Sequence, residues 1–309
     1  MDDSRPYRNV KWERQGLLFA PPDRPWSVTH ASLPVALART DGYRVYFASR
    51  DAANRSHVGW FDCSLQDQRV IRVSNEPVLA PGPLGTFDDH GVYPASIVEH
   101  GGRLFLYTIG WNPGAREPLF YSSIGLAISD DGGTTFERVS PAPIMARSEH
   151  DPCLVTSPFV LIDNDMWRMW YVSGFRWTEE SDGLHSHYHI KYAESDDGVN
   201  WRRDGLVAIA HHDGETNIAR PSVVKDGNRY RMWYSRGTSE GYRIGYAESD
   251  DGYTWERADY AAGINVPAEG FDAHAQAYPW VMRDFDRWLM LYNGDSFGRA
   301  GIGLATSSG

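Results

Sequence analysis

One internal repeat constrains the fold of this chain more than any other feature of the sequence. A block that reads Ile-Gly-Tyr-Ala-Glu-Ser-Asp-Asp-Gly at residues 244–252 recurs nearly verbatim at 124–132 and 190–198, and a shorter copy occupies 302–309. Each copy alternates apolar and polar residues and ends in Asp-Gly or Ser-Gly, which is typical of a strand that runs into a tight turn. The repeat therefore predicts an all-β protein built from similar units.

The spacing of five prolines indicates how many units there are. A block resembling Arg-Met-Trp-Tyr precedes each of these strands, and an X-Pro dipeptide followed by an apolar segment lies upstream of it. The prolines, which are 60, 64, 63 and 58 residues apart, are Pro34, Pro94, Pro158, Pro221 and Pro279. Five units of three or four antiparallel strands follow from this spacing. We therefore expect a single domain, residues 1–309, that forms a five-bladed β-propeller.

The two ends of the chain are predicted to meet in the last blade. Outer strands begin near Asn200 and Tyr253, after two of the Ser-Asp-Asp-Gly turns, but the last unit stops at Gly309 without such a strand. The N-terminal segment Val10–Arg14 contains Trp-Glu-Arg, which matches the Trp-Glu-Arg of the fourth unit. An N-terminal strand that closes the last blade would pair two otherwise exposed edges.

Charge and composition restrict the partners and the compartment. The net charge of −11 argues against nucleic acid or an anionic membrane surface as the main partner. No apolar run is long enough to span a membrane, and the first residues do not resemble a secretory signal. Cys63 and Cys153 cannot form a disulfide framework. We expect a cytoplasmic protein whose partner is a small molecule.

Candidate functional residues gather around the X-Pro positions, because the first strand of each propeller blade lines the central channel and the sequence departs from its own repeat there. The predicted catalytic carboxylates are Asp89, Glu149, Asp151 and Asp272. The predicted substrate-binding residues are His90, Tyr93, Trp111, Arg220, His274 and Tyr278. Paired carboxylates, here Asp89 and Asp151, can protonate a leaving group and activate a nucleophile. Arg220 could hold an anionic group, and Trp111 could stack on a sugar ring.

Histidines suggest a divalent metal as a second interpretation. His30, His90 and His150 are predicted to share the ion, with Glu149 or His274 as further ligands. No other cofactor is indicated. Three further histidines alternate within residues 185–189 and form either a metal-binding or substrate-contacting loop or a solvated one. The Ser-Asp-Asp-Gly segments are interpreted as hairpin turns rather than calcium loops.

On these motifs the sequence resembles the five-bladed propeller glycosidases and glycoside phosphorylases, which include arabinanase-, invertase- and mannoside phosphorylase-like enzymes. The motifs are Tyr-Ala-Glu-Ser-Asp-Asp-Gly, Arg-Met-Trp-Tyr and residues 85–94. The similarity is greatest to uncharacterised members found among polysaccharide-biosynthesis genes, which share endings like residues 290–298. The resemblance implies a glycoside hydrolase or phosphorylase-like enzyme.

The sequence departs from the catalytic pattern of that superfamily. Leu33 stands where arabinanase-like enzymes have an Asp before the first proline. Ser157 and Arg220 precede prolines where the family motifs are Glu-Gly-Pro and Glu-Cys-Pro. The standard triad therefore cannot be carried over residue by residue. Two hypotheses remain open: an enzyme that acts on a glycoside by hydrolysis, phosphorolysis or a metal-assisted variant, and a non-catalytic carbohydrate-binding propeller.

Overall fold

The computed structural model describes residues 10–308, which form antiparallel strands in five groups of four. The first group is β2 (Thr29–Arg39), β3 (Gly42–Arg50), β4 (Ser56–Ser64) and β5 (Arg69–Val73). The second is β6 (Gly91–His100), β7 (Arg103–Pro113), β8 (Phe120–Ser129) and β9 (Glu137–Arg138). The third is β10 (Leu154–Asp163), β11 (Met166–Glu180), β12 (Gly183–Ser195) and β13 (Val207–Ile209).

The remaining two groups complete the architecture. The fourth is β14 (Asn217–Asp226), β15 (Arg229–Thr238), β16 (Gly241–Ser249) and β17 (Glu256–Arg257). The fifth is β18 (Ala277–Asp284), β19 (Arg287–Asn293), β20 (Ile302–Ser308) and β1 (Glu13–Phe19). Helical turns occur at η1 (Asp259–Ala261) and α1 (Asp295–Gly298). Within residues 10–308 no helix is long and apolar enough to cross a membrane.

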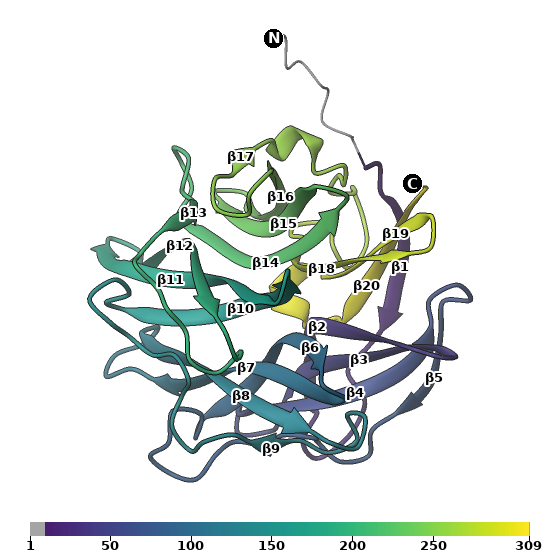
Figure 1. The fold of residues 1–309 in the computed structure, drawn as a ribbon, viewed down its shortest axis with the longest axis horizontal. Helices are drawn as coiled ribbons and strands as arrows, with labels where there is room; N and C mark the ends of the chain where they lie inside the picture. Colours follow the sequence, from purple (N-terminus) through teal and green to yellow (C-terminus); the bar gives the residue numbers. More distant parts are fainter. Residues whose placement is uncertain (1–9, 309) are drawn as a thin grey trace.

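The first strand of each group lies toward the middle of the molecule. Figure 1 shows β2, β6, β10, β14 and β18 around the centre, whereas β5, β9 and β17 lie at the periphery. Neighbouring first strands contact one another in sequence, and β18 contacts β2. The middle is therefore surrounded by one strand from each group.

The N-terminal strand β1 pairs antiparallel with β20, the last strand of the chain. The register joins Glu13 to Thr306 and Phe19 to Ile302. The pairing supplies hydrogen-bond partners to an edge of β20 that would otherwise be open. The first and the last strand of the described residues thus belong to the same sheet.

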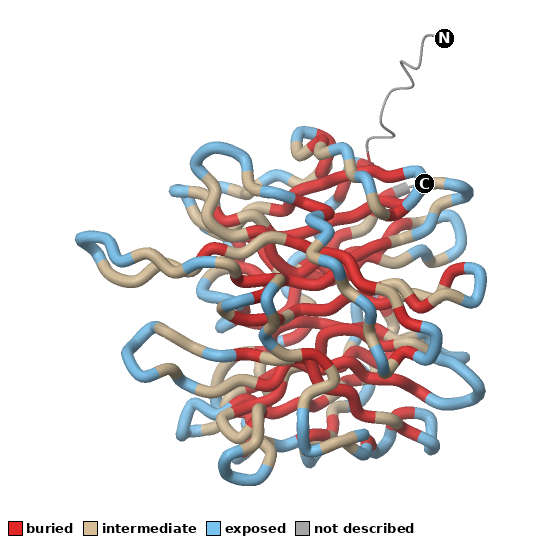
Figure 2. The backbone as a smooth tube through the Cα atoms, turned by 60° about the vertical axis from the view of Figure 1, so that its left-hand side comes forward, coloured by how far each residue is buried: buried red, intermediate tan, exposed pale blue. Residues whose placement is uncertain are grey.

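The buried residues follow the strands, and the turns are exposed (Figure 2). Trp170 and Trp233, from the Arg-Met-Trp-Tyr blocks of β11 and β15, are fully buried. The hairpin interpretation of the Ser-Asp-Asp-Gly segments is confirmed. Ser195 donates to the Asp197 carboxylate, which accepts the backbone N–H groups of Val199 and Asn200. These donors lower the pKa of Asp197, the backbone donor of Asn200 being the largest cause.

The X-Pro positions distort the first strands in the same way. Leu33, Ser157, Arg220 and Tyr278, each directly before a proline, have positive φ angles of 53°, 46°, 51° and 57°. A register irregularity accompanies each, as between Ala219 and Ser222. Positive φ is costly for a residue with a side chain and persists only where the surrounding structure enforces it. Four of the five first strands therefore carry a strained residue directly before their proline.

Candidate functional site

An aromatic cluster from the second group lies at the start of β6. The Trp111 ring is 4.4 Å from the His90 ring, edge to face, and 6.4 Å from the Tyr93 ring, which is nearly parallel to it. The Trp111 indole N–H donates to Ser56 Oγ at 2.9 Å, which fixes the ring. The structure thus brings together three of the predicted substrate-binding residues.

Asp89 lies beside this cluster. One carboxylate oxygen accepts from Asn112 Nδ2 at 2.6 Å, and the other accepts from the Gly85 backbone N–H at 2.8 Å. Asn112 directly follows Trp111 on β7. Asp89 is half-buried and, within residues 10–308, forms no ion pair with a cation. Its carboxylate is therefore held by neutral donors only.

A second aromatic cluster comes from the third, fourth and fifth groups. Tyr278 lies 6.3 Å from Tyr242 and 6.5 Å from Phe297, ring to ring. The Tyr188 and Tyr242 hydroxyls are 2.8 Å apart. Tyr278 and Tyr93 pack against the same small apolar group that contains Leu33. The two clusters are thus joined across the middle, and together we call them the aromatic arc: His90, Tyr93, Trp111, Tyr188, Tyr242, Tyr278 and Phe297.

The sequence analysis missed Phe297 as a member of this arc. Phe297 is 54% exposed, and it and Ser296 have positive φ angles of 58° and 53°. Two consecutive left-handed residues that carry side chains are strained, which is typical of functional positions. No sequence pattern identifies this conformation, because the residues that adopt it are not glycine or asparagine.

Arg220 lies in the interior rather than at the surface of the site. Its guanidinium donates to the Pro94 carbonyl at 3.2 Å and to the Pro34 carbonyl at 3.1 Å, and the residue is 1% exposed. Burial lowers the pKa of Arg220 to about 9. In this geometry Arg220 connects the first strands of three groups and presents no exposed face to an anion.

Asp151 is also fully buried. Its carboxylate accepts from Arg203 at 2.7 Å, from the Tyr171 hydroxyl at 3.2 Å and from Lys191 at 3.3 Å. No surface of Asp151 is exposed. A substrate cannot reach this carboxylate in the observed conformation, which favours a structural role over the predicted acid–base role.

The environment of Asp272 resembles that of Asp151, because the same carboxylate–arginine pair recurs in several strand groups. Asp272, which is 1% exposed, accepts from Arg14 of β1 at 3.1 Å and from the Tyr292 hydroxyl at 2.8 Å. In four groups a carboxylate before the first strand is paired with an arginine of the outer edge. The pairs are Asp88–Arg138, Asp151–Arg203, Glu215–Arg257 and Asp272–Arg14. We call these pairs the acid–arginine clamps.

Two predicted site residues, Glu149 and His274, have exposed side chains and are separate from the contacts that form the aromatic arc. The Glu149 side chain is 87% exposed and 3.8 Å from His150 Nε2. The His274 side chain is also 87% exposed, and its Nδ1 lies 2.8 Å from the Asp295 carboxylate. Within the described part of the chain, neither residue has a ring contact with the aromatic arc.

The predicted metal trio is not brought together. Among residues 10–308, two groups of three or more His, Cys, Asp or Glu have ligand atoms within 4.8 Å of one another, and neither contains His30, His90 or His150. The reason is that each imidazole has a different environment. His90 packs against Trp111, and His30 Nδ1 lies 2.9 Å from Thr29 Oγ1. Burial, with Arg50 and Arg299 nearby, lowers the pKa of His30 to about 4.

The alternating histidines of β12 do not share a metal either. His185 pairs with Asp182 in an exposed cluster that includes Glu180. His187 Nε2 contacts the Thr178 hydroxyl, and the His189 ring stacks on Phe175 at 4.7 Å. Neither His187 nor His189 belongs to the clusters found in residues 10–308.

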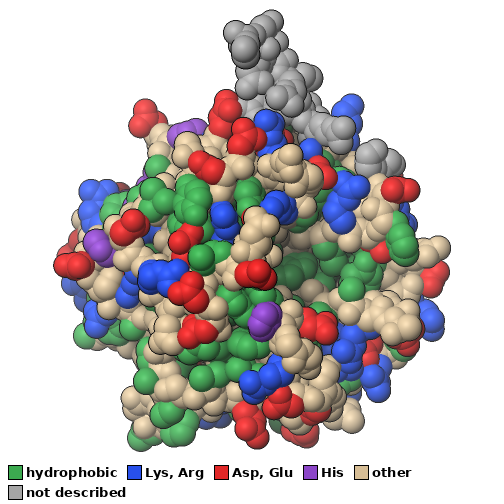
Figure 3. Space-filling view, viewed as in Figure 1, with side chains coloured by type: hydrophobic (Ala, Val, Ile, Leu, Met, Phe, Trp, Pro, Cys, Tyr) green, Lys and Arg blue, Asp and Glu red, His purple; other side chains and the backbone are tan. Residues whose placement is uncertain are grey.

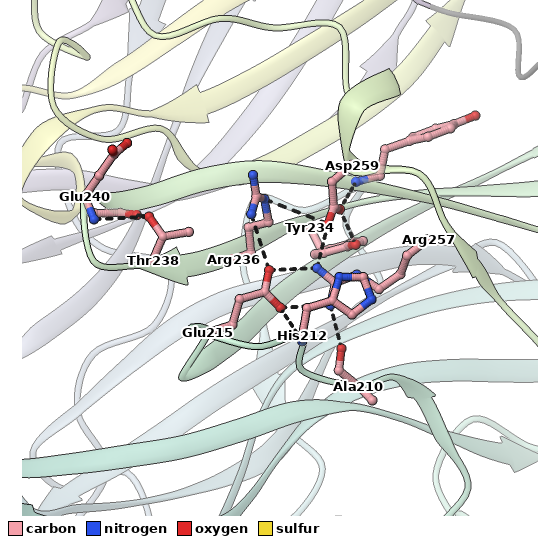
Figure 4. A network of polar contacts seen from close by, with 11 residues as sticks. Ala210, His212, Glu215, Tyr234, Arg236, Thr238, Glu240, Arg257 and Asp259 are labelled. Carbon is pink, nitrogen blue, oxygen red and sulfur yellow. Dashed lines mark hydrogen bonds and ion pairs between the residues drawn. The ribbon is translucent and has the colours of Figure 1, made fainter.

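The second cluster, His212–Glu215–Asp259, is an ion-pair network (Figure 4). Arg257 Nη2 lies 2.8 Å from a Glu215 oxygen and 2.6 Å from an Asp259 oxygen. Because the guanidinium neutralises both carboxylates, a cation would have to displace it. This arrangement favours the acid–arginine clamp over a metal site.

Comparisons with known proteins show the following similarities. No family model matches the chain. Rv1502 of Mycobacterium tuberculosis, an uncharacterised protein, is 40% identical over 301 residues, which cover 96% of this chain and 99% of that protein. The β-1,2-mannobiose phosphorylase of a Thermoanaerobacter species is 26% identical over 148 residues, 45% of this chain and 46% of that enzyme. A solved glycoside hydrolase has a TM-score of 0.77 at 19% identity, covering 98% and 94% of the two chains.

Proposed function

The chain belongs to the same family as the mycobacterial protein Rv1502, and we propose that it is a carbohydrate-active enzyme that cleaves a glycosidic bond at the aromatic arc. The fold shared with a glycoside hydrolase and the partial similarity to a mannobiose phosphorylase support this proposal. In it the chain is a single domain, and its five strand groups are the blades of a propeller closed by β1. The contacts between successive first strands and the β1–β20 pairing support this closure.

The observation that carries the proposal is an aromatic arc next to a carboxylate that lacks a cation partner. Faces of Trp and Tyr stack on the apolar faces of sugar rings. Trp111 and Phe297 lie on opposite clusters of the arc, and Asp89 is held next to Trp111 through Asn112. A sugar bound on Trp111 would therefore place its glycosidic oxygen near Asp89.

Asp89 is the proposed general acid. A protonated carboxyl donates its proton to the glycosidic oxygen while the bond from that oxygen to the anomeric carbon breaks, and an oxygen of water or phosphate forms the new bond to the anomeric carbon as the alcohol leaves. Water needs a second carboxylate to activate it, whereas inorganic phosphate is already an anionic nucleophile. Asp151 and Asp272 are enclosed in acid–arginine clamps and are not available as the second carboxylate. Phosphorolysis needs only one free carboxylate, so we favour it over hydrolysis.

The test is a cleavage assay on the purified full chain. β-1,2-Mannobiose and a panel of aryl glycosides would be incubated with and without inorganic phosphate, and free sugar and sugar phosphate would be measured. Asp89→Asn should reduce turnover about 100-fold or more while the circular dichroism spectrum is unchanged. The matched control is Glu99→Gln, an exposed carboxylate at the opposite end of β6, which should retain full turnover. Equal turnover by Asp89→Asn and the wild type would contradict the assignment.

A carbohydrate-binding propeller without catalysis is the second candidate. The burial of Asp151 and Asp272 in ion pairs, together with Leu33 before the first proline, favours it. This alternative predicts that sugars bind, that Trp111→Ala weakens the binding and that no substrate in the panel turns over.

A further inference from the structure

An open cavity of about 960 Å³ lies between the fourth and fifth strand groups. Its walls come from the β15–β16 hairpin, the segment that follows η1, the residues just before β1, and Gln276. Two contacts connect it to the aromatic arc: Arg243 and the Gln276 backbone N–H both donate to the Tyr242 carbonyl, at 3.0 Å. The volume is at the upper end of the range of small-molecule sites, roughly 300–1,000 Å³.

Three cations line this cavity, and their charges are incompletely paired. Lys11 is exposed and, within residues 10–308, forms no hydrogen bond or ion pair. Arg236 forms two long ion pairs, at 3.4 Å to Glu215 and at 4.0 Å to Asp259, and its Nη2 has no hydrogen-bond partner among the described residues. Arg243 donates mainly to backbone carbonyls and pairs at 3.4 Å with Glu240, whose side chain is 80% exposed. The cavity thus offers several unused cationic donors.

The acidic residues in the wall do not cancel these charges. Asp259 accepts from Arg257 at 2.6 Å and from the Tyr234 hydroxyl at 2.5 Å, and Figure 4 shows Arg257 between Asp259 and Glu215. Asp259 also lies 4.0 Å from Arg236 Nε, so its charge is shared between two arginines, and the cavity wall, with Lys11, Arg236 and Arg243 against Glu240 and Asp259, keeps an excess of positive charge. A net positive cavity in a chain of net charge −11 is a local exception that attracts an anion.

Polar groups in the same wall suit a ligand that also carries hydroxyls. Thr238, Ser239 and Asn265 line the cavity and can exchange hydrogen bonds with hydroxyl groups. The Gln276 side chain is buried and donates to the Asn265 carbonyl and to Asp272 instead. Tyr260, which is 79% exposed, lies at the wall as well. The space-filling view shows the face of the molecule on which acidic and basic side chains surround a hollow with hydrophobic side chains (Figure 3).

We propose that this cavity binds the anionic group of an acidic saccharide, a sugar that carries a carboxylate or a phosphate. This inference rests on the proposed function, because it makes the cavity an extension of the aromatic arc. One sugar ring would stack on the arc, and the charged ring would reach Lys11, Arg236 and Arg243. The substrate class is then a charged glycoside rather than a neutral one.

Calorimetry on the full chain tests this proposal with four probes: glucose, glucuronate, glucose 6-phosphate and inorganic phosphate. At least one charged sugar should bind about tenfold more tightly than glucose, because it adds charge-assisted hydrogen bonds that glucose lacks; tenfold corresponds to about 1.4 kcal/mol. Preference for glucuronate would identify a carboxylate as the group, and preference for glucose 6-phosphate would identify a phosphate. If neither is preferred, or if inorganic phosphate binds as tightly as the better charged sugar, the proposal is overturned.

Variants locate the preference in the cavity. Lys11→Gln/Arg236→Gln should remove the preference for the charged sugar, and Arg236→Lys should retain it because the charge is kept. Arg69→Gln is the matched control, an exposed arginine of β5 that, within the described residues, has no polar partner. If the double variant does not fold, Lys11→Gln alone carries the test, because within residues 10–308 Lys11 forms no hydrogen bond or ion pair that the substitution would remove. An unchanged preference in folded variants would overturn the assignment.

The failure of this inference can be separated from failure of the proposed function. Trp111→Ala should weaken the binding of glucose, because it removes the stacking surface, and should change the binding of the charged monosaccharides in the cavity much less, because Trp111 does not line the cavity. Binding of glucose without any preference for charge would leave the proposed function intact and refute the acidic ligand. Absence of binding by every sugar would refute both.

Discussion

Replacing Asp151 with Asn should destabilise the protein strongly, and the structure gives the size of the effect. Asn keeps the volume of the side chain but removes the negative charge that Lys191 and Arg203 share. The Lys191 side chain is 7% exposed and that of Arg203 is 16% exposed, so both charges would remain largely desolvated without a counterion. Breaking a buried ion pair by removing one partner costs about 3–5 kcal/mol. At roughly 2–4 °C per kcal/mol, the midpoint of thermal unfolding should fall by about 6–20 °C.

The measurement is a thermal melt followed by circular dichroism, with urea unfolding as a second probe. Glu149→Gln is the matched control, two residues earlier in the same loop, with a side chain that is 87% exposed. It should change stability by less than about 0.5 kcal/mol. An Asp151→Asn protein that melts like the wild type but loses turnover would refute the structural role and restore the catalytic one.

Three other perturbations have defined outcomes. Deleting residues 1–20 removes β1 and the Arg14–Asp272 clamp, so size-exclusion chromatography should show aggregates; a monomer that melts like the full chain would contradict closure by β1. Burial, with Lys191 nearby, lowers the pKa of His189 to about 4, so the neutral ring contributes stability that is present above about pH 6.5 and is lost as the pH falls toward 4. His189→Phe should therefore lose less stability on acidification than the wild type, and equal losses in acid melts would count against it. Phe297→Ala should raise KM several-fold with little change in the melting temperature; an unchanged KM would remove Phe297 from the binding surface.

The strand order could be predicted from the sequence because its determinants are local. The alternation of apolar and polar residues determines which face of each strand is buried. The Ser-Asp-Asp-Gly turns fix where the next strand starts, through hydrogen bonds between residues a few positions apart, such as that from Ser249 to Asp251. The match between the Trp-Glu-Arg near the N-terminus and the Trp-Glu-Arg of the fourth unit predicted that the N-terminal segment would occupy an outer-strand position, and β1 pairs with β20 there.

The roles of the carboxylates could not be predicted in the same way. The sequence analysis treated Asp151 and Asp272 as departures from the repeat, whereas the structure shows both in a recurring pair with an outer arginine. The signal was present, since an arginine recurs in the outer-strand motif, but the paired residues are 52 and 258 positions apart. Only the three-dimensional arrangement shows that the loop before one strand faces the last strand of the same group.

Arg220 connects the fold to the proposed site. Its two hydrogen bonds to the Pro34 and Pro94 carbonyls fix the distances among the first strands of the first, second and fourth groups. Tyr93 directly precedes Pro94, and Tyr278 packs with it against the same apolar group, so the spacing of the arc depends on these bonds. A buried guanidinium without a carboxylate partner is costly, and the two carbonyls are the acceptors that offset the cost. Since Arg220 is buried and its guanidinium is bound to backbone carbonyls, the proposed chemistry on a glycoside is assigned to Asp89, which is held beside Trp111 through Asn112.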